Sequence, residues 1–77
     1  MDRQARILAI IRKISKQQVT PAPDESLFDA GLLDSFALPD MVNALEQEFG
    51  IRVPDSDLNP RQFESISRID QYVAGRL

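Results

Sequence analysis

Apolar residues recur at helical spacing in two parts of the chain. In residues 2–16 isoleucines stand at positions i, i+3, i+4 and i+7, which places them in one stripe of a helix that Asp2 can cap. In residues 38–49 the same spacing leads up to Gly50, and glycine ends helices readily because it adopts left-handed backbone angles. The apolar faces consist of Ile7, Ile10, Ile11 and Ile14 in the first stretch, and of Leu38, Met41, Val42, Leu45 and Phe49 in the second. The pattern predicts two amphipathic helices.

A third helical pattern covers residues 66–76, with Ser65 as its predicted N-cap. Its inward-facing positions are expected to be Ile66, Ile69, Tyr72 or Val73, and Leu77. Residues 55–58 have room for at most one helical turn. Asn59-Pro60 is a cap followed by proline, with Phe63 as its apolar anchor.

The length of 77 residues allows one small domain, and the 43% of hydrophobic and 27% of charged residues are typical of a globular chain. No stretch alternates at the period of a useful strand, and there is no internal repeat. We therefore expect residues 1–77 to form a single all-α domain, a small bundle of three main helices plus one short helix.

Residues 17–34 form a long first loop in this prediction, because Pro21 and Pro23 forbid a regular helix through them. The loop is unusually apolar, with Leu27, Phe28, Leu32 and Leu33. These side chains are expected to fold over the core and hold the loop in place. A long loop in so small a domain is usually functional or disordered, and these anchors favour a functional one.

Pro39 constrains the start of the second helix. Proline lacks an N–H and crowds the carbonyl four residues earlier, here that of Ser35, so it is tolerated only in the first turn. Residues 35–38 are therefore predicted to form a loose or tightly wound turn that leaves Ser35 exposed.

The net charge of −3 is unevenly distributed. Residues 1–18 carry a balance of +4 and the remainder a balance of −7, while residues 34–48 hold four acids and no base. Such a surface repels nucleic acid and suits a partner with a basic face. The alternative is that these acids, Asp34, Asp40, Glu46 and Glu48, are only the solvated face of a helix.

The composition also limits which catalytic groups the chain can offer and where in the cell it is expected. The chain has no cysteine and no histidine, so it lacks a thiol, a disulfide and the commonest general base. The longest apolar run, residues 7–11, is too short to cross a bilayer, and the N-terminus has no signal-peptide pattern. We expect a cytoplasmic monomer that does not insert into membranes.

The pair Asp34-Ser35 precedes the second helix and has three interpretations. Both residue types are common N-caps, so ordinary capping is one. Ser35 as an enzyme nucleophile is rejected, because no histidine is present and the nearest lysine in sequence, Lys16, belongs to another helix. The third is a modification site, since a helix N-terminus favours a negatively charged ester, and Asp34 could help a modifying enzyme to hold a divalent cation.

A longer pattern surrounds this pair. It runs Leu27-Phe28-x-x-Gly31-Leu32-Leu33-Asp34-Ser35-Phe36, then Leu45-Glu46-x-Glu48-Phe49-Gly50-Ile51-x-Val53-Pro54, then Asp57-Leu58 and Phe63-x-Ser65-Ile66. Together these motifs resemble the acyl carrier protein family over about residues 24–77. The Gly-Leu-Leu-Asp-Ser-Phe form is more similar to D-alanyl carriers and other stand-alone aminoacyl or acyl carriers than to the fatty-acid type.

The resemblance implies an acyl-carrier-like helical fold in which Ser35 bears a 4′-phosphopantetheine arm taken from coenzyme A. The chain would then be a substrate and shuttle rather than an enzyme, and the arm would supply the thiol that the chain lacks. The implied partners are a phosphopantetheinyl transferase, an adenylating ligase that loads an acyl or aminoacyl group, and an enzyme that accepts it.

Several residues around the pair are predicted to contact those partners: Phe36, Leu38, Asp40, Met41 and Glu46. Two of the residues here depart from the family pattern. Phe36 replaces the usual leucine, and Pro39 replaces a polar or acidic residue, so both bear on which cargo is carried. Two alternatives stay open: a D-alanyl carrier for cell-envelope polymers, and a helical interaction module that is never modified.

Overall fold

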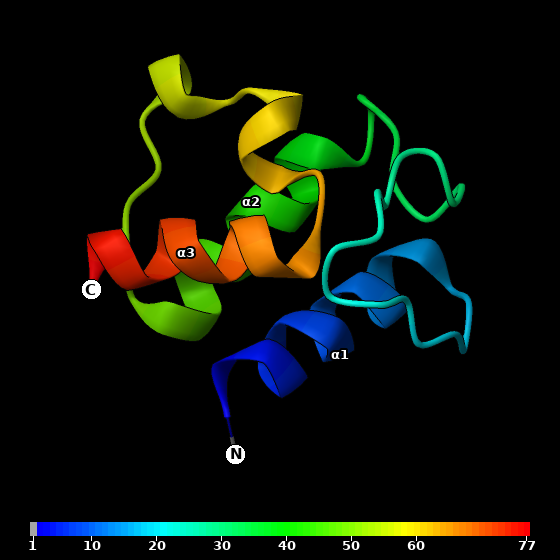
Figure 1. Cartoon of the computed structure of the whole chain (residues 1–77). Helices are drawn as coiled ribbons and strands as arrows, with labels where there is room; N and C mark the ends of the chain where they lie inside the picture. The colour runs from blue at the N-terminus through cyan, green and yellow to red at the C-terminus, as the bar shows by residue number, and fades with distance from the viewer. Residues whose placement is uncertain (1) are drawn as a thin grey trace.

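Three α-helices pack around one apolar core in the computed structural model, which describes residues 2–77 (Figure 1). They are α1 (Arg3–Ser15), α2 (Leu38–Phe49) and α3 (Ile66–Arg76), and α1 packs against both of the others. The described residues contain no strand. The all-α prediction is therefore confirmed, although two short 3-10 helices, η1 (Asp55–Asp57) and η2 (Pro60–Phe63), replace the single short helix expected.

Helix α1 begins and ends close to where its sequence pattern predicted. The Asp2 carboxylate accepts a hydrogen bond from the Ala5 N–H at 2.7 Å, which makes Asp2 the N-cap. Ile7, Ile10 and Ile11 are buried, and Ile14 packs against the edge of the core. The helix ends at Lys16, which takes a left-handed conformation with φ 60° and donates its N–H to the Arg12 carbonyl.

Helix α2 has the predicted bounds. Pro39 lies within its first turn, where the missing N–H leaves no hydrogen bond unmade. Gly50 ends the helix with φ 66°, a conformation that costs glycine little because it has no Cβ. Leu38, Met41, Val42 and Leu45 face the core. The carboxylate of Glu46 then accepts the Val53 N–H at 2.8 Å, which holds the segment after the helix against it.

Helix α3 is capped by Ser65, as predicted, because its hydroxyl accepts the Arg68 N–H at 3.2 Å. Ile66, Ile69 and Val73 are buried. The expectation that Leu77 faces inward was wrong: its side chain is 68% exposed, because the helix ends at Arg76 and the last residue lies beyond the core.

Both short helices contact Tyr72 of α3, η2 through an aromatic ring and η1 through a hydrogen bond. Phe63 of η2 is fully buried, and its ring centroid lies 5.0 Å from that of Tyr72 in α3. The Tyr72 hydroxyl donates a hydrogen bond to the carboxylate of Asp57 in η1 at 2.7 Å. Burial, followed by this hydrogen bond, raises the pKa of Tyr72 to about 12. Both 3-10 helices are thus tied to one face of α3.

The long first loop is pinned to the core, as its apolar residues predicted. Leu27, Leu32 and Leu33 are at most 5% exposed, and Phe28 packs against them from the edge. The loop also bonds to α3, because the Ser67 N–H donates to the Pro23 carbonyl at 3.0 Å. In Figure 1 the loop covers the side of the bundle where α1 ends and α2 begins. Among the helices described, none is long and apolar enough to cross a membrane.

The buried face of α2 generates a stability prediction. Leu45 is 0% exposed at the centre of the core, so Leu45→Ala should leave a cavity and lower the free energy of unfolding by about 2–5 kcal/mol. Urea titration followed by circular dichroism measures the loss. Gln47→Ala, on the exposed side of the same helix, is the control and should unfold as the wild type does. Equal midpoints for both variants would contradict the assignment of the core.

An ion pair joins the two ends of the chain. Arg3 donates a hydrogen bond to Asp70, and this bond lowers the pKa of the Asp70 carboxyl and raises that of the Arg3 guanidinium. Because the folded state favours ionised Asp70, the pair stabilises the fold above the carboxyl's ordinary pKa of about 4, and this stability is lost as the pH falls through the lowered value.

Asp70→Asn should therefore lower the melting temperature at pH 7 and bring progressively less change as the pH falls through the lowered pKa of the wild-type carboxyl, which then becomes protonated as well. Thermal melts of both proteins across this range measure the difference. A constant difference at every pH would show that the substitution acts through packing and not through charge.

Candidate functional site at the start of helix α2

Ser35 lies in a tight turn that leads into α2. The Asp34 carbonyl accepts hydrogen bonds from the N–H groups of Ala37 and Leu38, both at 3.1 Å, and the Asp34 carboxylate accepts the Ala37 N–H at 2.8 Å. Residues 35–37 are thus wound into a turn, and regular helix begins only at Leu38. The predicted wound turn is confirmed for residues 35–37, whereas Leu38, which the prediction included, already belongs to α2.

Ser35 itself is exposed and does not cap the helix. The N-cap position of α2 belongs to Ala37, and no side chain caps it. The capping interpretation therefore applies to Asp34, whose carboxylate holds the turn, and leaves the Ser35 hydroxyl without that structural role. A hydroxyl that lies at a helix start and faces solvent is open to modification by another protein.

The turn rests on a fixed support made by the loop. The Leu27 carbonyl accepts the N–H groups of both Leu32 and Leu33, at 2.9 and 3.1 Å, which closes residues 27–33 into a compact bend. Leu27 in turn donates its N–H to the Glu64 carbonyl at 2.7 Å, just before α3. Gly31 takes φ 77° inside the bend, a conformation that would strain a residue with a Cβ. Ser35 is therefore held by the core although it lies outside it.

Phe36 stands next to Ser35 and is 90% exposed. Burying an aromatic ring of this size against another protein gives a large gain in free energy, and aromatic residues are often the anchors of interfaces. Asp40, one turn further along α2, is also exposed. Both side chains are thus exposed, and their contact with partner proteins stays a prediction.

The other predicted contact residues are placed differently. Leu38 is 5% exposed and Met41 is 0% exposed, so a docked protein cannot touch either of them while α2 keeps its position, and their assignment to the contact surface is corrected. Both belong to the apolar stripe that faces the core, and helical spacing alone does not separate a buried stripe from a docking one. Glu46 is half-buried and engaged with the Val53 N–H.

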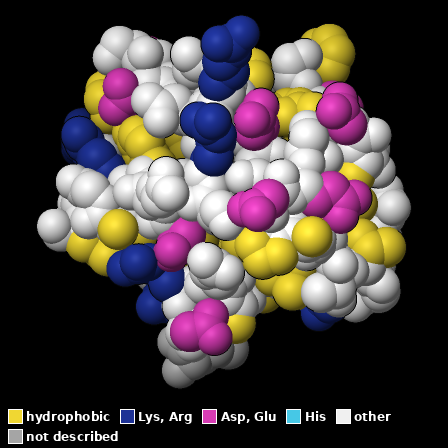
Figure 2. Space-filling view, in the orientation of Figure 1, with side chains coloured by type: hydrophobic (Ala, Val, Ile, Leu, Met, Phe, Trp, Pro, Cys, Tyr) yellow, Lys and Arg dark blue, Asp and Glu magenta, His cyan; other side chains and the backbone are white. Residues whose placement is uncertain are grey.

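The acids of residues 34–48 also differ in their surroundings: some bond within the fold, and others face solvent. Glu48 accepts a hydrogen bond from the Arg6 guanidinium at 2.7 Å, and this guanidinium also lies 4.5 Å from the centre of the Phe49 ring. Glu46 and Glu48 thus serve the fold, whereas Asp40 faces solvent. In Figure 2 the acidic side chains are spread singly over the face shown and do not form one patch.

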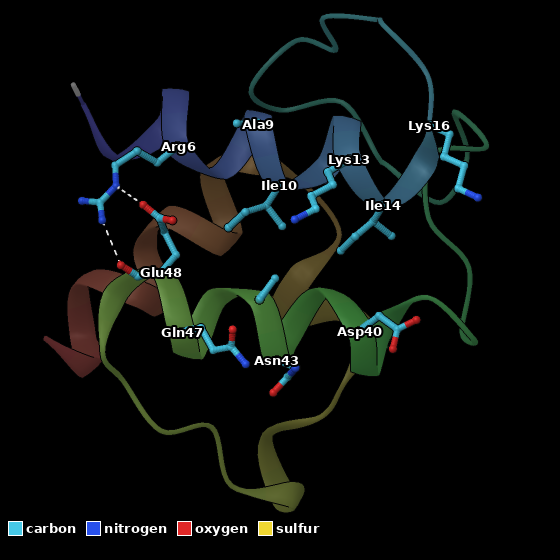
Figure 3. Close-up of a pocket in the computed structure, with 11 residues that line it drawn as sticks. Arg6, Ala9, Ile10, Lys13, Ile14, Lys16, Asp40, Asn43, Gln47 and Glu48 are labelled. Atoms are coloured by element: carbon cyan, nitrogen blue, oxygen red, sulfur yellow. Dashed lines mark hydrogen bonds and ion pairs between the residues drawn. The ribbon is translucent and has the colours of Figure 1, made fainter.

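A groove that sequence analysis missed lies between α1 and α2, with a volume of about 840 Å³ (Figure 3). Its lining residues come from both helices and include Ile10 and Ile14 of α1 and Asn43 and Ala44 of α2. No local pattern could have revealed the groove, because it depends on how two helices far apart in sequence pair.

These residues fit a covalently attached phosphopantetheine. The attachment requires an accessible hydroxyl, which Ser35 has, on backbone that is held by its neighbours. The N-terminus of α2 offers a positive dipole that favours the resulting phosphodiester. In the part of the chain that the structure describes, no cluster of three or more histidine, cysteine, aspartate or glutamate residues could hold a metal.

Comparison with known proteins agrees with this geometry. Residues 5–73 match the family model described as "Phosphopantetheine attachment site". The D-alanyl carrier protein of Streptococcus sanguinis is 36% identical over 73 residues, covering 95% of this chain and 92% of that protein. The D-alanyl carrier protein of Lactobacillus acidophilus is 32% identical over 69 residues, covering 90% of this chain and 87% of that protein.

The role of Asp34 in the turn can be tested. Asp34→Ala removes the acceptor of the Ala37 N–H and should lower the free energy of unfolding by about 1 kcal/mol, whereas Asp34→Asn keeps an oxygen acceptor and should recover most of the loss. Chemical denaturation measures both variants. Asp29→Ala, an exposed acid of the same loop, is the control. If Asp34→Ala were as stable as this control, the carboxylate would not be holding the turn.

Proposed function

Because the chain belongs to the phosphopantetheine attachment family of carrier proteins, we propose that Ser35 carries a 4′-phosphopantetheine arm and that the protein holds an acyl or aminoacyl group on it as a thioester. The observation that carries the proposal is the exposed Ser35 hydroxyl in a braced turn at the start of α2. The arm supplies a thiol to a chain that has no cysteine.

Each residue of the turn has a distinct role in this proposal. Ser35 offers its hydroxyl as the acceptor when a transferase moves the arm from coenzyme A. Asp34 holds the turn with one carboxylate oxygen, and its exposed carboxylate is positioned to help the transferase hold a divalent cation. The start of α2 stabilises the negative charge that the phosphodiester leaves on Ser35.

The chain acts in this proposal as the substrate of other enzymes and performs no catalysis itself. Its partners are a phosphopantetheinyl transferase, an adenylating ligase and an enzyme that accepts the thioester. Phe36 and Asp40 form the contact surface for them: the ring supplies buried area, and the carboxylate attracts a basic face and speeds association.

D-Alanine is the cargo that has a specific observation in its favour. The similar proteins from Streptococcus sanguinis and Streptococcus suis, each 36% identical to this chain, are both named D-alanyl carrier proteins. The two alignments cover 95% and 90% of this chain. A D-alanyl group is therefore the first cargo to test among acyl and aminoacyl groups.

The attachment site is tested by intact mass. Incubation with coenzyme A and a phosphopantetheinyl transferase of broad specificity should add one arm to the wild type and none to Ser35→Ala. The chain offers a matched control in Asp55-Ser56, a second exposed serine that follows an aspartate at the start of a helical turn. Ser56→Ala should be modified as the wild type is.

Two outcomes would contradict the proposal. An unmodified wild type, under conditions that modify a known carrier, would favour an interaction module that only docks a partner. Loading that persists in Ser35→Ala would place the arm on another residue. With the arm in place, addition of a D-alanine-activating ligase and ATP should add one D-alanyl group, and preference for another acid would exclude the D-alanyl assignment.

A further inference from the structure

The groove between α1 and α2 runs along both helices. Figure 3 shows its lining side chains in two rows, one from each helix. On α2 the lining extends from Asp40 to Glu48, and because a helix rises about 1.5 Å per residue, the groove is about 12 Å long. It therefore has room for about two turns of a further helix laid against this pair.

The floor of the groove is apolar. Ile10 is 9% exposed, and Ile14 and Ala44 are half-buried beside it. The two isoleucines stand four residues apart, so they lie on the same side of α1. An amphipathic helix that lies in a groove buries its apolar anchors against a floor of this kind.

The charges of the rim are partly neutralised within the fold. At one end Arg6 donates a hydrogen bond to the Glu48 carboxylate at 2.7 Å, so these two charges cancel. At the other end stand Lys16 and Asp40, and Lys13 reaches from α1 toward α2 between the two ends (Figure 3). These three form no ion pair among the described residues. A complementary helix carries acids on the side that faces α1.

The groove excludes the attachment residue. Ser35 is not among its lining residues, although Asp40 at its end is only five residues further along the chain. A protein that occupies the groove thus leaves the Ser35 hydroxyl uncovered. A transferase must reach this hydroxyl, so the groove suits an enzyme that acts later, at the far end of the arm.

Of the enzymes that use the arm, the adenylating ligase has the greater need of such a contact. An adenylated acid reacts with any thiol that reaches it, so the ligase can select one carrier only through contacts away from the thiol. The enzyme that accepts the thioester can recognise the cargo as well.

We propose that the α1/α2 groove is a docking site for an acidic amphipathic helix of the ligase, an inference that rests on the attachment at Ser35. The apolar side of that helix packs on Ile10, Ile14 and Ala44, and its acids face Lys13 and Lys16. This contact adds to the exposed Phe36 and Asp40 at the turn and fixes the orientation in which the ligase meets the arm.

The test is the kinetics of loading. Protein that carries the arm, as established by mass, is loaded by a D-alanine-activating ligase with ATP over a series of protein concentrations. Lys13→Glu with Lys16→Glu should raise the KM for the protein about tenfold and leave kcat unchanged, because the groove is remote from the reacting thiol. Amide chemical shifts of Ile10, Asn43 and Gln47 should change when the ligase is added.

Matched variants locate the effect in the groove. Arg52→Glu with Arg61→Glu makes the same change in net charge at exposed positions that do not line the groove, and it should keep the wild-type KM. Ala9→Trp fills the groove from α1 and should raise the KM, whereas Ala74→Trp, at an exposed position of α3, should not. Thermal melts of all four variants establish that they are folded.

Three outcomes would overturn the inference and leave the attachment standing. In the first, the arm is attached but the KM of the lysine variant equals that of the wild type, and the shifts along the groove do not change with the ligase. In the second, both double variants raise the KM equally, which would assign the effect to net charge. In the third, the lysine variant takes up the arm itself more slowly, which would assign the groove to the transferase. Absence of any mass gain in the wild type would overturn both proposals.

Discussion

The backbone of Leu27 is the point on which the functional end of the molecule depends. Its N–H bonds to the Glu64 carbonyl at 2.7 Å, its carbonyl accepts the N–H groups of Leu32 and Leu33, and its side chain is fully buried. One residue thus joins the long loop to the region where α3 begins. It also closes the bend of residues 27–33, which directly precedes the turn of Ser35. Together with the bond from the Ser67 N–H to the Pro23 carbonyl and the buried Leu32 and Leu33, it orders more than twenty residues between α1 and α2.

The turn at Asp34 shows how a short segment can be rigid and accessible at once. Hydrogen bonds to the Asp34 carbonyl and carboxylate order residues 35–37, while buried Leu33 and Leu38 hold the two ends of the turn in the core. Between these ends, Ser35 and Phe36 project outward. The turn consequently presents a hydroxyl of defined position at the surface while the core stays intact.

Charge in this protein serves stability and recognition at different positions. Arg3, Arg6 and Arg12 connect α1 to the other parts of the fold through Asp70, Glu48 and the loop carbonyl of Val19. Because these exposed and half-exposed bonds are individually weak, they chiefly orient the elements that the core has already brought together. Asp40, Lys13 and Lys16 are exposed and form no ion pair with any residue from 2 to 77.

The sequence by itself determined the helices, several of their caps and the turn that precedes α2, because these depend on neighbours within about four residues. Asp2, Gly50 and Ser65 end or begin helices through such local bonds, and Pro39 restricts the turn before α2 in the same way. The motif around Ser35 was equally local, so the family could be identified from it.

Only the tertiary structure decided which apolar and charged residues stay available to other molecules. Met41 and Phe36 are both apolar residues near the start of α2, yet one is fully buried and the other is 90% exposed, because the packing of α1, α3 and the loop covers one side of the helix alone. Glu48 and Asp40 differ for the same reason, since Arg6 of α1 reaches only the far end of α2. The groove between α1 and α2 depends on the pairing of two helices that are far apart in sequence, and local patterns carry no information about that pairing.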